Sequence, residues 1–232
     1  MTTPRSRVLD LFSRAGAAGK GYEDAGFQVD GCDIADRPRY PFPYHRGDAL
    51  EYLVHLIVTG NIERYALVHA SPPCQAKNTL TVGTNHARGW GGTHEDLVAP
   101  TRELLDRTGL PYVIEQPNGR AEIRKDLSLC GEMFSLGVLR HRNFELGRWS
   151  TVQPAHPRHR GYVRGWRHGV YRDGPYIAAY GKGGGKGDVI EMQQAMGITW
   201  TDVHEKLTEA IPPAYTKWIG TAFLTARQEV IV

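Results

Sequence analysis

The sequence has little cysteine and no long apolar run. Its three cysteines, Cys32, Cys74 and Cys130, are far apart and form no C-x-x-C pair, so neither a disulfide framework nor a cysteine-rich zinc site is expected. No apolar stretch approaches the roughly 20 residues that a membrane helix needs, and no signal-peptide hydrophobic segment follows the first residues. We therefore expect a cytoplasmic protein with free thiols and no membrane contact.

The net charge of the chain is also close to zero. Lys and Arg number 28 against 25 Asp and Glu, and the formal net charge of +3 is too small to indicate a partner by itself. The chain has 232 residues, of which 41% are hydrophobic. This is enough for one good core with a small appended lobe.

The first part of the chain predicts a nucleotide-binding α/β domain. Residues 8–12 form an apolar strand pattern, residues 13–19 a small-residue turn that leads into a helix, and residues 27–32 a second strand. In such folds small residues let the backbone approach a ligand, and an acid about 20 residues later accepts hydrogen bonds from ribose hydroxyls. Asp33 occupies that position, although it could also be a strand-end turn residue.

The rest of the chain continues the alternation of strands and helices. Helices are predicted at 49–58, 93–105, 189–196 and 202–207, with a last helix opened by 210–213, and strands at 65–70 and 110–114. This alternation predicts an α/β Rossmann-like fold. We expect residues 1–146 to form the main domain, 147–187 a small lobe, and 188–232 helices that return to the main domain.

The loop after the strand at 65–70 presents a thiol. In Ser71-Pro72-Pro73-Cys74-Gln75 the two prolines restrict the backbone, so Cys74 is held at a defined place and is a candidate nucleophile. A small buried hydrophobe after a strand end is the alternative.

A carboxylate and two arginines are further candidates. Glu115 follows the strand at 110–114, at the edge where open α/β sheets bind ligands, although it could simply cap a turn. Arg140 and Arg142 are expected on one strand, where a period of two puts both on the same face. Both could point into one anionic or carbonyl-lined site. The alternative is that they lie on the surface of the strand without such a role.

Residues 147–187 are basic and rich in aromatics, with Asp173 as the only acid. Cations that neutralise phosphates and planar side chains that stack are typical of a nucleic-acid-binding lobe, and a solvated basic surface is the alternative. His156, His159 and His168 show no convincing metal spacing, so we interpret them as phosphate contacts or surface residues and expect no metal.

Taken together, these motifs resemble the DNA cytosine-5 methyltransferases. Pro72-Pro73-Cys74-Gln75 resembles the catalytic motif of that family, and Asp10-Leu11-Phe12-Ser13 with Gly16 resembles its first motif, which receives S-adenosylmethionine. Residues 191–197 and 210–213 resemble later motifs in family order. The resemblance runs from about residue 9 to residue 220 and implies the S-adenosylmethionine-dependent methyltransferase fold of class I.

The resemblance implies a cofactor site that leaves S-adenosylhomocysteine as product. Its residues would be Phe12, Ser13, Gly16, Ala17, Asp33, Ile34, Asp48, Ala49 and Pro73. Arg14 and Ala17 stand at family glycines, and Arg14 lies in a turn where φ above zero is expected. Glu209 stands where the family has Asn.

The resemblance also implies the catalytic roles. Cys74 would attack C6 of a cytosine, Glu115 would contact N3 and the amino group, and Arg142 would contact O2, with Arg140 supporting Cys74. Gln116 and Pro117 differ from the family residues after the Glu. Residues 76–92 would form a loop that closes over the base.

Double-stranded DNA is the implied partner, with the target base flipped out of the duplex by a protein that we expect to be a monomer. The expected DNA contacts are Gln75, Arg158, Arg160, Arg164 and Arg167. Three alternatives remain: a tRNA methyltransferase of the same superfamily, a catalytically idle DNA-binding relative, and a small-molecule methyltransferase, which the basic lobe disfavours.

Overall fold

The computed structural model describes residues 5–73, 96–119, 122–181, 183 and 185–229. A seven-stranded sheet with the order β3-β2-β1-β4-β5-β7-β6 forms its centre. The strands are β1 (Arg7–Leu11), β2 (Gln28–Asp33), β3 (Tyr44–Arg46), β4 (Leu67–Ala70), β5 (Tyr112–Pro117), β6 (Leu127–Leu129) and β7 (Arg142–Gly147). The first five are parallel, whereas β7 is antiparallel to both β5 and β6. The strand order reverses between β1 and β4, which is where open α/β sheets bind ligands.

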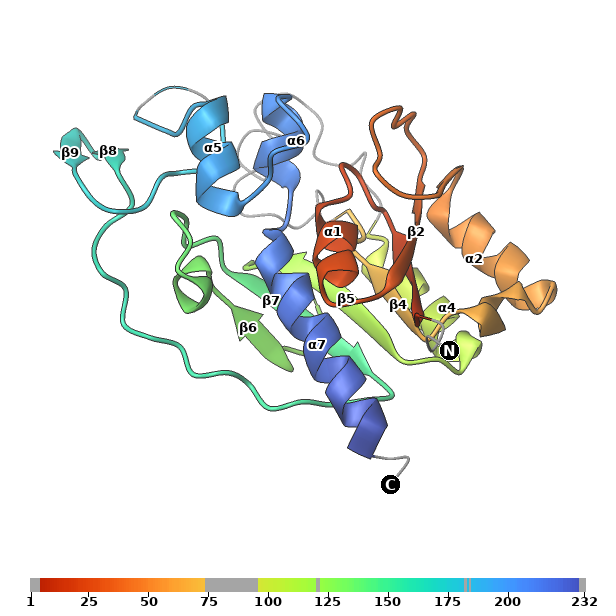
Figure 1. The fold of residues 1–232 in the computed structure, drawn as a ribbon. Helices are drawn as coiled ribbons and strands as arrows, with labels where there is room; N and C mark the ends of the chain where they lie inside the picture. Colours follow the sequence, from red (N-terminus) through yellow and green to blue (C-terminus); the bar gives the residue numbers. More distant parts are fainter. Residues whose placement is uncertain (1–4, 74–95, 120–121, 182, 184, 230–232) are drawn as a thin grey trace.

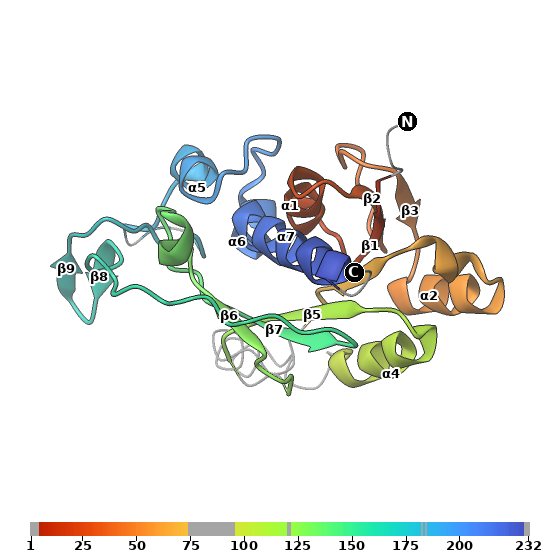
Figure 2. The ribbon, with the colours of Figure 1, turned by 60° about the horizontal axis from the view of Figure 1, so that its bottom comes forward.

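Helices cover both faces of this sheet (Figure 2). Helices α1 (Ala17–Asp24) and α7 (Pro213–Glu229) lie together on one face, and α2 (Ala49–Val58) and α4 (Val98–Thr108) lie on the other. Each face has its own apolar core, the first rich in aromatics such as Tyr22 and Phe223, the second in leucines such as Leu53 and Leu105. The predicted α/β Rossmann-like fold class is confirmed.

Close contact between α1 and α7 depends on Gly21. A Cβ atom there would lie 2.1 Å from both Pro213 O and Thr216 Oγ1, so a larger residue would push α7 away. The Thr216 hydroxyl donates to Ala18 O at 2.8 Å, which adds a polar link to the apolar packing. The C-terminal helix is thereby held beside the helix that follows the first turn.

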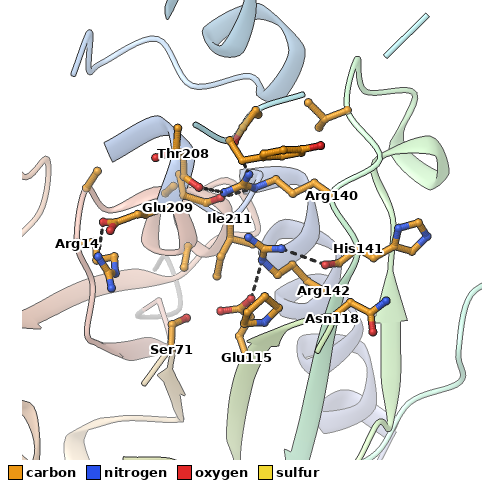
Figure 3. Close-up of a pocket in the computed structure, with 18 of the residues that line it drawn as sticks. Arg14, Ser71, Glu115, Asn118, Arg140, His141, Arg142, Thr208, Glu209 and Ile211 are labelled. Carbon is orange, nitrogen blue, oxygen red and sulfur yellow. Dashed lines mark hydrogen bonds and ion pairs between the residues drawn. The ribbon is translucent and has the colours of Figure 1, made fainter. Parts of the chain in front are cut away.

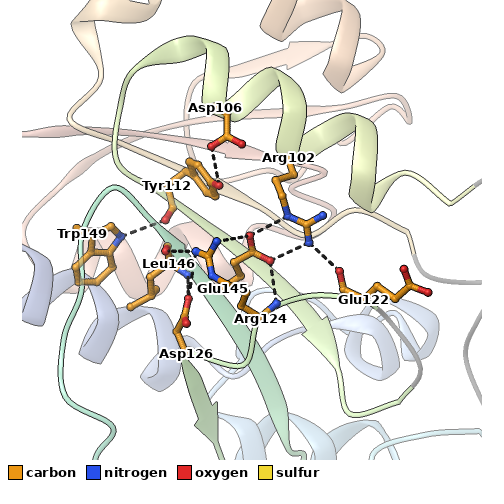
Figure 4. Close-up of polar contacts among 9 residues, drawn as sticks. All are labelled: Arg102, Asp106, Tyr112, Glu122, Arg124, Asp126, Glu145, Leu146 and Trp149. Atoms are coloured by element: carbon orange, nitrogen blue, oxygen red, sulfur yellow. Dashed lines mark hydrogen bonds and ion pairs between the residues drawn. The ribbon is translucent and has the colours of Figure 1, made fainter.

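A buried acid fastens α4 to the sheet (Figure 4). Glu145 on β7 accepts two hydrogen bonds from Arg102 of α4, at 2.8 and 2.9 Å, and one from the backbone N–H of Arg124 at 3.0 Å. Burial raises the pKa of Glu145, but these donors outweigh it, so its pKa lies below the usual value. The carboxylate therefore stays charged and ties three segments together.

Smaller elements complete the fold. These are the 3-10 turns η1 (Asn61–Arg64) and η2 (Gly131–Phe134), the hairpin β8 (Gly165–Arg167) and β9 (Val170–Arg172), and helices α5 (Val189–Met196) and α6 (His204–Glu209). A long connection without helix or strand leads from β7 to β8, so the hairpin lies far from the sheet (Figure 1). No helix in the described part of the chain is long and apolar enough to cross a bilayer.

Most predicted elements are confirmed, and two expectations are wrong. The helices at 49–58 and 189–196 have the predicted bounds. The helix expected from Thr93 begins only at Val98, after Leu97, and runs to Thr108; Thr93 itself lies outside the described residues. Arg140 and Arg142 do not alternate along one strand, because β7 begins at Arg142 and Arg140 has a left-handed backbone with φ of 38°.

Candidate active site

A pocket of about 570 Å³ opens where β1, β4 and β5 end (Figure 3). Its wall is formed by the turn after β1, the loop after β4, the end of β5, and segments that converge from the second half of the chain. Its lining includes Phe12, Ser13, Ala17, Ser71, Pro73, Glu115, Asn118, Arg140, His141, Arg142, Thr208, Glu209 and Ile211. The pocket therefore lies at the sheet edge where the fold class places its ligands.

The turn after β1 has three residues in the left-handed region. Phe12, Arg14 and Gly16 have φ of 58°, 47° and 78°, so the expected positive φ at Arg14 is confirmed. Asp33 steadies the turn, because its Oδ2 accepts from the backbone N–H of Arg14 at 2.9 Å. The indole of Trp200 donates to Ala15 O at 2.9 Å. The turn is thus held from the sheet and from the C-terminal region.

An ion pair between Arg14 and Glu209 spans the pocket wall (Figure 3). The two residues are 195 positions apart in the sequence, and both are partly exposed. Each stands where the resembled family has another residue, and their opposite charges are the signal that could have predicted the contact. No local pattern links the two positions, so the sequence shows them as two separate departures from that family.

Glu115 and Arg142 form the charged centre of the pocket (Figure 3). Arg142 Nε lies 2.9 Å from Glu115 Oε1, yet this oxygen makes no well-aligned hydrogen bond within the described part of the chain. Burial raises the pKa of Glu115, and Arg142 opposes that rise. A buried carboxyl that holds its proton more readily can donate a hydrogen bond to a ligand.

The loop before Cys74 is held from two sides. Gln116 Nε2 donates to Pro72 O at 2.7 Å, so the residue that departs from the family Asn supports this loop. Ser71 Oγ lies 3.1 Å from Nε2 of His69, whose Nδ1 lies 3.0 Å from the Tyr22 hydroxyl. Burial lowers the pKa of His69 to about 3, so this histidine stays neutral. Sequence reasoning missed Ser71 and His69, because neither role has a local signal.

Arg140 joins the pocket wall in an unexpected way. Its guanidinium donates to three backbone carbonyls, Ala210 O at 2.7 Å, Ala179 O at 2.9 Å and Thr208 O at 2.6 Å. Burial and the charge of Arg142 lower its pKa to about 9. Arg140 therefore fastens the segment before β7 to the C-terminal end of α6 and to the segment before α5.

Comparison with solved structures identifies proteins with a similar fold. The Entamoeba histolytica methyltransferase EhMeth matches over 96% of this chain and 99% of its own, with 10% identity and a TM-score of 0.51. The chain has a methyltransferase fold. A SAM-dependent methyltransferase from Agrobacterium tumefaciens shares 19% identity over 52% of this chain, with a TM-score of 0.36, and the match spans only 41% of that neighbour. No protein-family profile and no curated protein sequence matches the chain.

In this methyltransferase fold the pocket gathers only part of the expected cofactor site. Phe12, Ser13, Ala17 and Pro73 line it, whereas five other expected residues do not. Those five are Gly16, Asp33, Ile34, Asp48 and Ala49. Asp48 caps α2 by accepting from Leu50 N and Glu51 N, and the Ile34 side chain is exposed.

Of the expected DNA contacts, three arginines have partners within the chain. Arg160 Nε lies 2.9 Å from Glu132 Oε1, Arg164 Nη2 lies 2.6 Å from Glu191 Oε1, and Arg167 donates to the Tyr180 hydroxyl at 2.8 Å. Arg158 is exposed. Cys74, Gln75 and the expected loop at 76–92 lie outside the described residues.

Proposed function

We propose that this protein is an S-adenosylmethionine-dependent DNA (cytosine-5)-methyltransferase. One observation carries the proposal: a single pocket of a methyltransferase fold holds Pro73, directly before Cys74, together with Glu115 and Arg142. A thiol, a buried carboxyl and a guanidinium are the groups that addition to a cytosine ring requires. The order of the motifs along the chain supports the same reading.

The described residues fit the cofactor. The pocket volume lies within the usual range of small-molecule sites, and the small residues Ala15, Ala17 and Ala18 keep the wall beside the first turn open. Phe12 and Ser13 would hold S-adenosylmethionine there, which supplies an activated methyl group when bound. Asp33 does not line the pocket, and its carboxylate already accepts from Arg14 N, Ala35 N and Arg37, so it would support the cofactor site by holding the first turn.

The chemistry follows from the proposed nucleophile and acid. The Cys74 thiolate forms a bond to C6 of cytosine, and the electron pair of the C5–C6 double bond makes C5 nucleophilic. Glu115 donates its proton toward N3 and Arg142 donates toward O2, so charge that develops on the ring is stabilised. After C5 is methylated, water accepts the C5 proton, which restores the double bond and expels the thiolate, and N3 returns its proton to Glu115.

Duplex DNA is the proposed substrate, and the protein would act as a cytoplasmic monomer. Cytosine C5 and C6 are stacked inside the duplex, so the base must be flipped out at a cost of a few kcal/mol. Gln75 and the basic segment 147–187 are proposed to contact the DNA and offset this cost.

Bisulfite sequencing tests the proposal. Plasmid DNA would be taken from cells that lack their own cytosine-5 methylation and express wild type, Cys74→Ala or Cys32→Ala, the last as a matched control because Cys32 is buried away from the pocket in β2. We expect new 5-methylcytosine with wild type and Cys32→Ala only. New 5-methylcytosine with Cys74→Ala, or its appearance in cellular tRNA rather than in DNA, would contradict the proposal.

A further inference from the structure

Four side chains with metal-ligating atoms converge beside β6 and β7. They are Cys130, His141, His156 and His159, and their sulfur and nitrogen atoms all lie within 4.8 Å of one another. The sequence separates them as Cys-x10-His-x14-His-x2-His, a spacing that by itself predicts no metal site. Only the fold brings the four together.

One distance within the cluster matches that between two ligands of a single zinc ion. Cys130 Sγ lies 3.5 Å from His159 Nε2. Zinc bonds of about 2.3 Å to sulfur and about 2.0 Å to nitrogen place two tetrahedral ligands about 3.5 Å apart. The three imidazole rings lie 5.0 to 5.5 Å apart between centroids, so their nitrogens can reach a common point.

The types of ligand atom favour zinc over magnesium and calcium. One thiolate with three imidazoles suits zinc, whereas magnesium and calcium prefer oxygen ligands. Four protein ligands would complete a tetrahedral shell and leave no position for a substrate, which is the pattern of structural rather than catalytic zinc.

The ligands come from three segments of the chain. Cys130 directly follows β6, His141 directly precedes β7, and His156 and His159 lie on the connection between β7 and β8, which has neither helix nor strand (Figure 1). His141 also lines the pocket and precedes Arg142, the partner of Glu115. A bound ion would therefore link the connection, the sheet edge and the pocket wall.

We infer that Cys130, His141, His156 and His159 form a structural zinc site. The ion fastens the connection that carries the hairpin β8–β9 to the edge of the sheet, and it steadies the backbone that presents Arg142. The inference does not depend on the proposed methyl transfer, because metal content and activity are measured separately.

The test uses the full-length protein without a histidine tag, saturated with zinc and then dialysed. Elemental mass spectrometry should find about one zinc per chain in wild type and at least a tenfold loss in Cys130→Ser and His156→Ala. His168→Ala is the matched control, because His168 lies in the same basic segment but outside the cluster, and it should retain the metal.

Cobalt provides a second readout. Cobalt-substituted wild type should show the charge-transfer absorption of a thiolate ligand and the strong visible bands of tetrahedral cobalt, and Cys130→Ser should lose the former. His156 is exposed, so its replacement leaves the apolar core intact and decides the question even where Cys130→Ser does not fold. Less than about a tenth of a zinc per wild-type chain, or equal loss in His168→Ala, would overturn the inference.

Discussion

At the residue scale, Arg14 sits in a conformation that favours glycine. Its φ of 47° lies in the left-handed region, where a side chain costs roughly 1 kcal/mol relative to glycine. Two interactions oppose this cost: the backbone N–H bonds to Asp33, and the guanidinium pairs with Glu209. The ion pair is partly exposed, so its own contribution is at most about 1 kcal/mol.

Arg14→Gly should therefore be more stable than Arg14→Ala. Both variants lose the ion pair with Glu209, but only glycine relieves the left-handed backbone, so we expect a difference of about 1 kcal/mol in the free energy of unfolding. Urea unfolding of the two variants measures it. Equal midpoints would show that the turn carries no such strain.

Asp10 introduces a pH dependence. It is buried in β1 beside the pocket, and burial raises its pKa from 3.8 to about 7 despite hydrogen bonds from Gly19 N–H and Tyr40. The folded state thus holds the proton more tightly than the unfolded state. The destabilising contribution is absent below pH 3.8, grows as the pH rises and is complete above about 7.

Asp10→Asn should remove this contribution. The variant should lose less stability than wild type between pH 4 and 8, and it should be more stable at pH 8 by on the order of 2–4 kcal/mol. Urea unfolding across this pH range measures the effect, with Asp173→Asn as the control because Asp173 is exposed. If Asp10→Asn follows the wild-type profile, the carboxyl is already ionised at no cost.

At the element scale, the pocket wall depends on contacts between segments distant in sequence. The Arg140 guanidinium donates to the carbonyls of Thr208, Ala179 and Ala210, which joins the segment before β7 to the end of α6 and to the segment before α5. A lysine ammonium cannot reproduce this planar set of donors. The wall is therefore sensitive to the shape of the side chain as well as to its charge.

Arg140→Lys should lower the free energy of unfolding by about 2–3 kcal/mol, because buried carbonyls lose their donors. Arg148→Lys is the matched control: Arg148 also has a left-handed backbone, but it is exposed and donates to Asp106 O at 2.9 Å. It should change stability by about 0.5 kcal/mol or less. A loss of similar size in both variants would show that the hydrogen bonds from Arg140 to the three carbonyls contribute little to stability.

At the scale of the whole molecule, the basic segment is less available than its composition suggests. Arg160 and Arg164 pair with Glu132 and Glu191, acids that lie outside the segment in sequence. An arginine whose charge is already balanced neutralises few phosphates. Exposed Arg158 is the better candidate for a phosphate contact.

Under the proposed function, Arg158→Ala should reduce the slope of log affinity against log salt for duplex DNA by about 0.9, the value for one phosphate contact. Arg164→Ala should leave the slope nearly unchanged, because its partner is Glu191. Fluorescence anisotropy at several salt concentrations measures both slopes. A larger change with Arg164→Ala would show that the ion pair opens on DNA.

The sequence by itself determined the alternation of strands and helices up to β5, the edge of the sheet that carries the pocket, and the candidates Pro73, Glu115 and Arg142. These follow from hydrophobic periodicity and short motifs, which are properties of neighbouring residues. Only the tertiary structure decided the Arg14–Glu209 ion pair, the hydrogen bonds from Arg140 to three carbonyls, and the cluster of Cys130 with three histidines. Such contacts join residues far apart along the chain, and packing of the whole fold selects them because no local pattern encodes the distance between them.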